Sequence, residues 1–144
     1  MLLTGIIPFA FAKEFTIPAK TESLYTENFI QERREIDLKE FLIEEINGRI
    51  RYNNDLAILF EIIKRESNWD AEVCNKKIGC ESGQGLFQII PNTFKSCQKV
   101  ISELEDAFNP FDNIKCGLWL YYETSPGICH WQNYSGPYNE ARCP

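Results

Sequence analysis

Apolar residues recur at helical spacing in two stretches of the first half of the chain. In the first stretch, Asp37 is followed three residues later by Glu40, which is the spacing of a capping box at a helix start. The apolar positions that follow keep to one helix face: Leu38, Phe41, Leu42 and Ile46. Gly48 is typical of a helix end. The pattern predicts a helix from Asp37 to Gly48, preceded by a polar, poorly periodic and extended lead-in over 13–35.

The second stretch predicts a helix that carries an acidic residue on its apolar face. Asn54 or Asp55 is expected to cap it. Its apolar stripe consists of Leu56, Leu59, Ile62 and Ile63. Glu66 continues that stripe, four residues after Ile62, and lies in the last turn. Burial and the negative end of the helix dipole both raise the pKa of a carboxyl group placed there, so Glu66 is expected to hold a proton near neutral pH.

The rest of the chain predicts shorter elements. They are, in order, a loop over 68–82, a run over 83–90, a helix from Asn92, a helix opened by Pro110 and Asp112, and a Gly-, Pro- and aromatic-rich tail from Ser125. In the last helix Ile114, Leu118, Tyr121 and Tyr122 are expected to face inward. This order predicts a mainly α (α+β) fold, in one small domain with a long central helix.

The first twelve residues, MLLTGIIPFAFA, carry no charge and are largely apolar. They end in Ala10-Phe11-Ala12, which fits a signal-peptidase site before Lys13. A basic segment is absent, and a buried N-terminal strand is the alternative. Twelve residues are too short to span a bilayer as a helix. We therefore expect a signal peptide over 1–12, no stable membrane insertion, and a secreted, periplasmic or cell-wall location.

Composition narrows the function classes. The 144 residues are 44% hydrophobic and 13% aromatic, which suits a packed domain rather than a disordered chain. The formal net charge of -6 argues against nucleic acid as a partner, because phosphate contacts need a basic surface.

The six cysteines all fall in the second half of the chain. In a small exported protein an even number indicates disulfides. A zinc site is disfavoured because there is one histidine and no Cys-x-x-Cys pair, and no cofactor is expected. Among the fifteen pairings that six cysteines allow, we expect the local ones: Cys74–Cys80, Cys97–Cys116 and Cys129–Cys143.

Four segments in order resemble the soluble lytic transglycosylase family. They are Glu66-Ser67, the run Gly85-Leu86-Phe87-Gln88-Ile89-Ile90-Pro91 with Thr93, the segment Asn109-Pro110 to Asn113-Ile114 and Gly117, and the closing Trp131 to Gly136. Phe87 stands where the family usually has Met. Two departures are a Gly79 where the family usually has Ser, with Ser82 close by, and Ser135 where Asn is expected after Tyr134. Tyr138-Asn139 is a second possible match for the closing motif.

The resemblance implies a lysozyme-like fold and cleavage of the β-1,4 bond between N-acetylmuramic acid and N-acetylglucosamine in peptidoglycan glycan strands. It implies that Glu66 is the catalytic acid, and that the substrate's own C6 hydroxyl or N-acetyl group replaces the second carboxylate of most glycosidases. If a second carboxylate takes part, the nearby ones are Asp70, Glu72 and Glu81.

Substrate contacts implied by the resemblance have structural alternatives. The implied contacts are Ser67, Ser82, Gln88, Asn113, Trp131 and Tyr134. Asn113 could instead be a hydrogen bonder at a helix start, and Trp131 and Tyr134 could be core aromatics. His130 is expected to be structural, since this chemistry does not require it. Ser67 is not expected to be a nucleophile because no motif supplies it with a base.

These expectations give a domain organisation and a function with defined rivals. We expect a lead-in and helix over 13–47 and a lysozyme-like transglycosylase domain over 48–144, acting as a monomer. The alternatives are a hydrolytic lysozyme and a non-catalytic lysozyme-like module that binds glycans.

Overall fold

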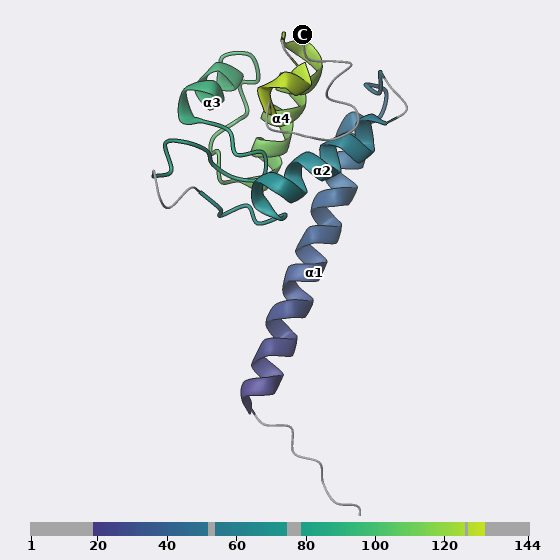
Figure 1. Ribbon diagram of the computed structural model, residues 1–144, viewed down its shortest axis with the longest axis vertical. Coiled ribbons are helices and arrows are strands. Elements are labelled where there is room, and N and C mark those ends of the chain that lie inside the picture. Colours follow the sequence, from purple (N-terminus) through teal and green to yellow (C-terminus); the bar gives the residue numbers. More distant parts are fainter. Residues whose placement is uncertain (1–18, 52–53, 75–78, 126, 132–144) are drawn as a thin grey trace, which may run out of the picture. The chain divides into compact units, whose positions relative to one another are not determined.

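The computed structural model describes residues 19–51, 54–74, 79–125 and 127–131, with side chains from residue 26 onward. Its helices are α1 (Ala19–Ile46), α2 (Asp55–Ser67), α3 (Pro91–Gln98), α4 (Pro110–Glu123) and the 3-10 helix η1 (Gly127–Trp131) (Figure 1). The chain divides into two compact units, Met1–Arg33 and Arg34–Pro144. In the first unit the described residues are the beginning of α1; the second unit contains all the other elements.

α1 begins at Ala19, well before Asp37. The expectation of an extended lead-in is therefore wrong from Ala19 onward. Residues 19–36 include four Glu and two Arg, which favour a helix without help from an apolar stripe. The side chains from Thr26 to Arg34 are all exposed, so apolar periodicity could not reveal the helix there. The end agrees with the prediction: α1 stops at Ile46, and Gly48 has a φ of +83°.

The second unit is built around the apolar face of α2, as predicted. Of the predicted stripe, Leu59, Ile62 and Ile63 are at most 1% exposed, and Leu56 is partly buried against the core. Ile58, which the prediction did not include, is also fully buried. The last part of α1 contributes Leu38, Leu42 and Ile46 to the same cluster, and α4 contributes Ile114, Leu118, Tyr121 and Tyr122. α4 also packs against α3 and η1. All four of the α4 side chains that we expected to face inward are buried.

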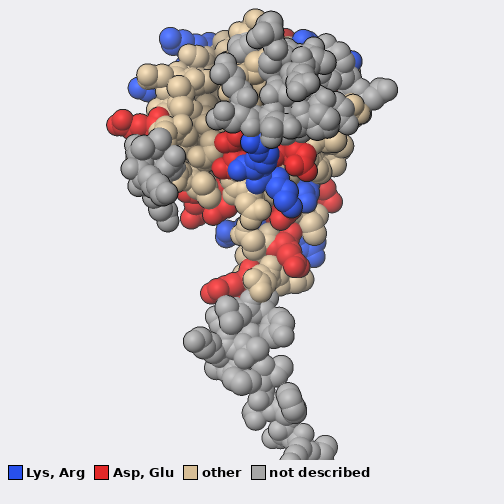
Figure 2. Space-filling model, in the orientation of Figure 1, with Lys and Arg blue, Asp and Glu red and all other residues tan. Residues whose placement is uncertain are grey.

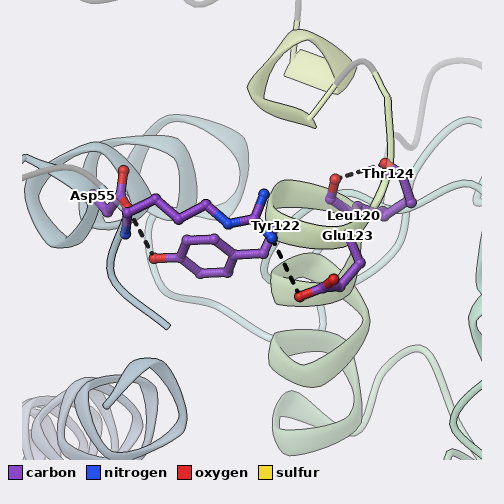
Figure 3. Close-up of polar contacts among 6 residues, drawn as sticks. Asp55, Leu120, Tyr122, Glu123 and Thr124 are labelled. Carbon is purple, nitrogen blue, oxygen red and sulfur yellow. Dashed lines mark hydrogen bonds and ion pairs between the residues drawn. The ribbon is translucent and has the colours of Figure 1, made fainter. Parts of the chain in front are cut away.

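A buried acidic residue ties the start of α2 to the end of α4. Asn54 precedes the helix without a side-chain cap. Asp55 instead is fully buried and accepts hydrogen bonds from the hydroxyls of Tyr121 at 2.8 Å and Tyr122 at 3.3 Å. Its Oδ2 also accepts from the backbone N–H of Arg51 at 2.9 Å. Figure 3 shows Asp55 facing Tyr122. In the same region Glu123 forms an ion pair with the guanidinium of Arg51. This network fixes the position of α2 relative to α4.

The run over 83–90, called the Gly-rich loop below, is an irregular loop held by two isolated bridges, Cys74 to Gln84 and Gln84 to Ile89. The amide of Gln84 donates to the carbonyl of Ile89 at 3.1 Å, and the reverse bond is 3.0 Å long. Gly85 has a φ of +68°, and a Cβ there would lie 2.5 Å from the carbonyl oxygen of Ala107. Glycine is therefore required at this position by both backbone conformation and space.

Two of the three expected disulfides are confirmed: Cys74 is bonded to Cys80, and Cys97 to Cys116. Cys129 is also disulfide-bonded. Its expected partner, Cys143, lies outside the described residues, so that pairing stays a prediction. Among the cysteines that the structure describes, none is free.

Charge is mixed on the surface. Figure 2 shows acidic side chains next to basic ones on the face in view, with no uninterrupted basic surface there. Within the described residues, no helix combines the length and apolar character needed to cross a membrane.

Candidate active site

Glu66 lies in the last turn of α2, where the sequence pattern predicted it. The helix ends directly afterwards: Asn68 is left-handed, with a φ of 52°, and its N–H donates to the carbonyl of Lys64 at 3.0 Å. The side chain of Glu66 is half-buried. Loss of solvent raises the pKa of its carboxyl group, and the charge of Arg65 opposes that rise without cancelling it. A larger fraction of Glu66 is therefore protonated at mildly acidic pH than of an ordinary glutamic acid.

The two serines named for the site are held by local backbone. Ser67 is 5% exposed and its hydroxyl donates to the carbonyl of Ile63 at 3.0 Å. That bond directs the hydroxyl back onto α2, so Ser67 completes the helix end rather than facing a ligand. Ser82 is half-buried and its hydroxyl donates to the carbonyl of Gly79 at 3.0 Å.

A cavity of about 160 Å³ lies between the Gly-rich loop, α3, α4 and η1. Its lining residues are Phe87, Gln88, Ile89, Ile90, Thr93, Leu120, His130 and Trp131. The cavity brings together two of the sequence segments singled out above, the run from Gly85 to Thr93 and the closing segment that begins at Trp131. Glu66 is not one of the lining residues.

Gln88 lines the cavity, and hydrogen bonds from its side-chain amide hold it in place. Its Nε2 donates to the carbonyls of Val73 and Gly85, both at 2.8 Å. The residue has a φ of 50°, which non-glycine residues adopt uncommonly. Both Nε2 hydrogens are thus used internally, which leaves the carbonyl oxygen of the side chain as the group suited to a ligand.

Trp131 is a core aromatic that also forms part of the cavity wall. It is 8% exposed, its indole N–H donates to the carbonyl of Phe87 at 2.9 Å, and its ring centroid lies 5.4 Å from that of Phe87. The sequence left two roles open for Trp131. The structure combines burial with a place in the wall.

His130, which was expected to be structural, hydrogen-bonds to Thr124 and also lines the cavity. Its Nε2 lies 2.8 Å from the hydroxyl oxygen of Thr124, and that hydroxyl donates its hydrogen to the carbonyl of Leu120 at 2.7 Å (Figure 3). The Thr124 oxygen can then only accept, so Nε2 of His130 carries the proton and Nδ1 is the acceptor. Burial lowers the pKa of His130, which favours this neutral form. Its position directly before Trp131 was the sequence signal that could have indicated it.

The polar atoms of Asn113 are bonded internally, which favours a structural role over the expected ligand contact. The residue is fully buried. Its Oδ1 accepts from the N–H of Phe87 at 2.8 Å, and its Nδ2 donates to the carbonyls of Gln84 at 3.0 Å and Ala107 at 2.7 Å. Asn113 therefore anchors the Gly-rich loop to α4. The helix-start role belongs to Asn109, which accepts from the N–H groups of Phe111 and Asp112.

The other candidate residues are either exposed or outside the described part of the chain. Asp70, Glu72 and Glu81 are exposed. Asp70 accepts from the N–H of Glu72 at 2.9 Å, which is a local turn contact. Tyr134 lies outside the described residues, as does the alternative match Tyr138-Asn139. Within the part of the chain that is described, no group of three or more His, Cys, Asp or Glu is placed to hold a metal ion.

Comparison with known proteins identifies the family. The family model of the transglycosylase SLT domain matches residues 45–142, which includes α2, α3, α4, η1 and the cavity. No curated protein and no solved structure matches the chain. The mostly helical fold agrees with the mainly α, lysozyme-like SLT domain. The match covers well over half of the chain, and it contains both Glu66 and the Gly-rich loop: this chain belongs to the transglycosylase SLT domain family, which implies cleavage of peptidoglycan.

Proposed function

We propose that the protein is a lytic transglycosylase that cleaves the β-1,4 bond between N-acetylmuramic acid and N-acetylglucosamine, with Glu66 as its acid and base. The observation that carries this proposal is the half-buried carboxyl group of Glu66 at the end of α2, whose pKa is raised by burial. Glycosidic cleavage needs a positioned acid that is still protonated at the working pH.

The proposed reaction uses one carboxyl group twice. Glu66 first donates its proton to the glycosidic oxygen, and the bond between that oxygen and C1 of N-acetylmuramic acid breaks. The C6 hydroxyl of the same sugar then bonds to C1 and gives its proton to the Glu66 carboxylate. The products are a free N-acetylglucosamine end and a 1,6-anhydro end, and Glu66 is again protonated. Water in place of the C6 hydroxyl would give the hydrolytic outcome instead.

The surroundings of the other candidate carboxylates support a mechanism in which Glu66 is the single catalytic carboxyl group. Asp70, Glu72 and Glu81 are exposed and thus solvated, and Asp70 is engaged with the N–H of Glu72 in a turn. A second catalytic carboxylate would be expected beside the scissile bond within the active site.

We further propose that a sugar unit of the glycan strand occupies the cavity beside the Gly-rich loop. Its wall combines aromatic and apolar surface with a small number of polar groups, which is the composition of carbohydrate and small-molecule sites. Gln88 and His130 offer acceptor atoms there, and Trp131 offers ring surface. Ser82, which is half-buried, and Tyr134 stay proposed contacts, whereas Ser67 and Asn113 are assigned structural roles because they are buried and their polar atoms are bonded internally.

Export of the protein follows from the same proposal. Its substrate lies outside the cytoplasm, and disulfides persist in oxidising compartments. We propose that residues 1–12 act as a signal peptide, that residues 48–144 form the transglycosylase domain, and that the enzyme is a monomer.

The test is the substitution Glu66→Gln, compared with Glu61→Gln on the same helix. Glutamine is nearly isosteric but cannot donate the proton, so cleavage of purified cell walls should fall by roughly 10²–10⁴-fold. Glu61 is exposed, and its variant should keep the parent rate. Cleavage by Glu66→Gln within tenfold of the parent would contradict the assignment of the acid.

Mass spectrometry of the released muropeptides distinguishes the related reactions, because anhydro and hydrated ends differ by one water. Anhydro ends are expected. Hydrated ends would identify a hydrolytic lysozyme. Wall binding without any release of muropeptides would identify a non-catalytic glycan-binding module.

A further inference from the structure

The turn that follows Glu66 has an unusual backbone. Asn68 and Trp69 are consecutive and both left-handed, with φ values of 52° and 64°. Asparagine tolerates this region, but a bulky residue such as tryptophan is a rare occupant. Such a conformation persists only where the surrounding structure holds it in place. Because Glu66 lies three residues before Trp69, whatever holds Trp69 also limits the movement of the catalytic turn.

Trp69 is held by an aromatic partner on α2. It is 4% exposed, and its ring centroid lies 5.3 Å from that of Phe60 in an edge-to-face arrangement with an interplanar angle of 87°. Phe60 is one to two turns before Glu66 on the same helix. The Trp69 ring therefore folds back against the helix that carries the acid.

The third member of this group comes from α1. The ammonium nitrogen of Lys39 lies 5.2 Å from the centroid of Trp69 and 5.8 Å from that of Phe60, within the range of cation–π interactions. Lys39 is held in turn by an ion pair with Glu35 at 2.6 Å. Its neighbours Leu38 and Leu42 are buried in the core, which fixes the position of this part of α1. Lys39 also precedes residue 45, where the family match begins.

We propose that Lys39, Trp69 and Phe60 form a clamp that positions Glu66 for catalysis, and that α1 is thereby part of the catalytic machinery. This inference rests on the proposed role of Glu66 as the acid. Lys39 and Trp69 are positioning residues: they act through the turn at the end of α2. A cation held against both rings resists displacement of either ring, and thus keeps the strained turn in one conformation.

The test compares Lys39→Met, Lys39→Arg and Trp69→Phe in the full chain. Methionine keeps the length and apolar character of the side chain but removes the charge. We expect Lys39→Met to lower kcat about tenfold with KM within twofold of the parent, since small misplacement of a catalytic group acts on the chemical step. Arginine restores a cation over the rings, so Lys39→Arg should keep at least half of the parent kcat. Lys99→Met is the matched control, because Lys99 is exposed just beyond α3, and its kcat should be unchanged.

A second readout does not depend on activity. The titration of the Glu66 carboxyl group is followed by NMR in each variant. A loosened turn admits water, so the pKa of Glu66 should fall toward its ordinary value in Lys39→Met and Trp69→Phe, and stay raised in Lys39→Arg and Lys99→Met. This result would support the clamp even if Glu66→Gln showed that the proposed function is wrong.

Two results would overturn the clamp. The first is an unchanged Glu66 titration together with an unchanged kcat in Lys39→Met. The second is a loss of kcat shared equally by Lys39→Met and Lys39→Arg, with a lower melting temperature in both, because the residue would then be merely structural. If Lys39→Met does not fold, Trp69→Phe decides by the same two measurements.

Discussion

At the level of single residues, the placement of Glu66 could be predicted from the sequence and the contacts around it could not. Glu66 lies on an apolar stripe at a helix end, and both features are visible as spacing. The internal role of Asn113 is not visible, because it depends on the backbone of Gln84, Phe87 and Ala107 folding around one amide. A sequence motif indicates that a residue type is required at a position. It does not indicate whether the side chain binds a ligand or the backbone.

The raised pKa of Glu66 predicts an alkaline limb in the pH dependence of activity. The protonated form is the active one, so the rate of muropeptide release should fall as pH rises through that raised value. Because the group is half-buried, the optimum should be mildly acidic to neutral. The measurement covers about pH 4 to pH 9 at fixed ionic strength, so that wall binding does not vary through screening. A rate still climbing at the alkaline end would mean that a base is in control.

The same shift has a consequence for stability. A carboxyl group whose pKa is higher in the folded protein than in the unfolded chain binds its proton more tightly when folded. Its contribution to stability is therefore present at low pH and is lost as pH rises through the raised pKa. Glu66→Gln should remove this part of the pH dependence, as measured by urea denaturation between about pH 4 and pH 8. An identical dependence in parent and variant would mean that Glu66 does not titrate with a raised pKa.

Substitution of Asn113 tests its role as an anchor. Asn113→Ala leaves two buried backbone groups without these partners, the N–H of Phe87 and the carbonyl of Ala107, whereas the carbonyl of Gln84 keeps its bond from Ile89. Each group left unpaired costs roughly 1–3 kcal/mol, so we expect a loss of at least about 2 kcal/mol. Asn109→Ala removes a helix cap on the same element and should cost about 1 kcal/mol. Chemical denaturation of both variants measures the difference. A smaller loss for Asn113→Ala than for Asn109→Ala would contradict the anchoring role.

At the level of elements, helices with a buried face were predicted well and two segments were not. α2, α3 and α4 begin within a residue or two of their predicted starts, because capping residues, prolines and apolar stripes mark them. The first part of α1 has no buried face to produce a stripe, and only its composition favours the helix. The Gly-rich run has the apolar character of a strand, yet its backbone turns at Gly85 and Gln88, which have positive φ values.

A comparison of Gly85, in the Gly-rich loop, with Gly48, just after α1, separates the cost of a strained backbone from the cost of crowding. Gly48 and Gly85 have similar φ values, +83° and +68°, but a Cβ at Gly48 meets nothing within 4 Å, whereas one at Gly85 lies 2.5 Å from both the Ala107 carbonyl oxygen and Asn113 Nδ2. Gly48→Ala should therefore cost about 1–2 kcal/mol, from conformation alone. Gly85→Ala should cost about 1–3 kcal/mol more, because backbone must shift. Equal losses on chemical denaturation would mean that the loop relaxes freely around the added methyl group.

At the level of the whole molecule, the mainly helical fold class followed from the sequence because its helices carry local signals, and the described crosslinks are local too. The two described disulfides join cysteines that are 6 and 19 residues apart, whereas the core joins residues as distant as Asp55 and Tyr122. Loop closure of that size constrains the unfolded chain. The cavity could not be predicted in the same way, since its wall combines Gln88, Leu120 and His130 from three separate segments.

The unequal loops predict unequal contributions to stability. On the chain-entropy account, the 19-residue separation of Cys97 and Cys116 is worth about 3 kcal/mol and the 6-residue separation of Cys74 and Cys80 about 2 kcal/mol. Cys97 and Cys116 are also fully buried, whereas Cys80 is exposed, so replacing the first pair by alanine removes core packing as well. The double variant Cys97→Ala/Cys116→Ala should therefore be clearly less stable to urea than Cys74→Ala/Cys80→Ala.

A thiol titration of the denatured parent should find no free thiol, and each double variant should likewise show none, because the remaining pairs stay intact. Free thiols in a double variant would mean that its other cysteines depend on the missing pair, and equal losses of stability would mean that neither loop length nor burial governs the contribution of these bonds.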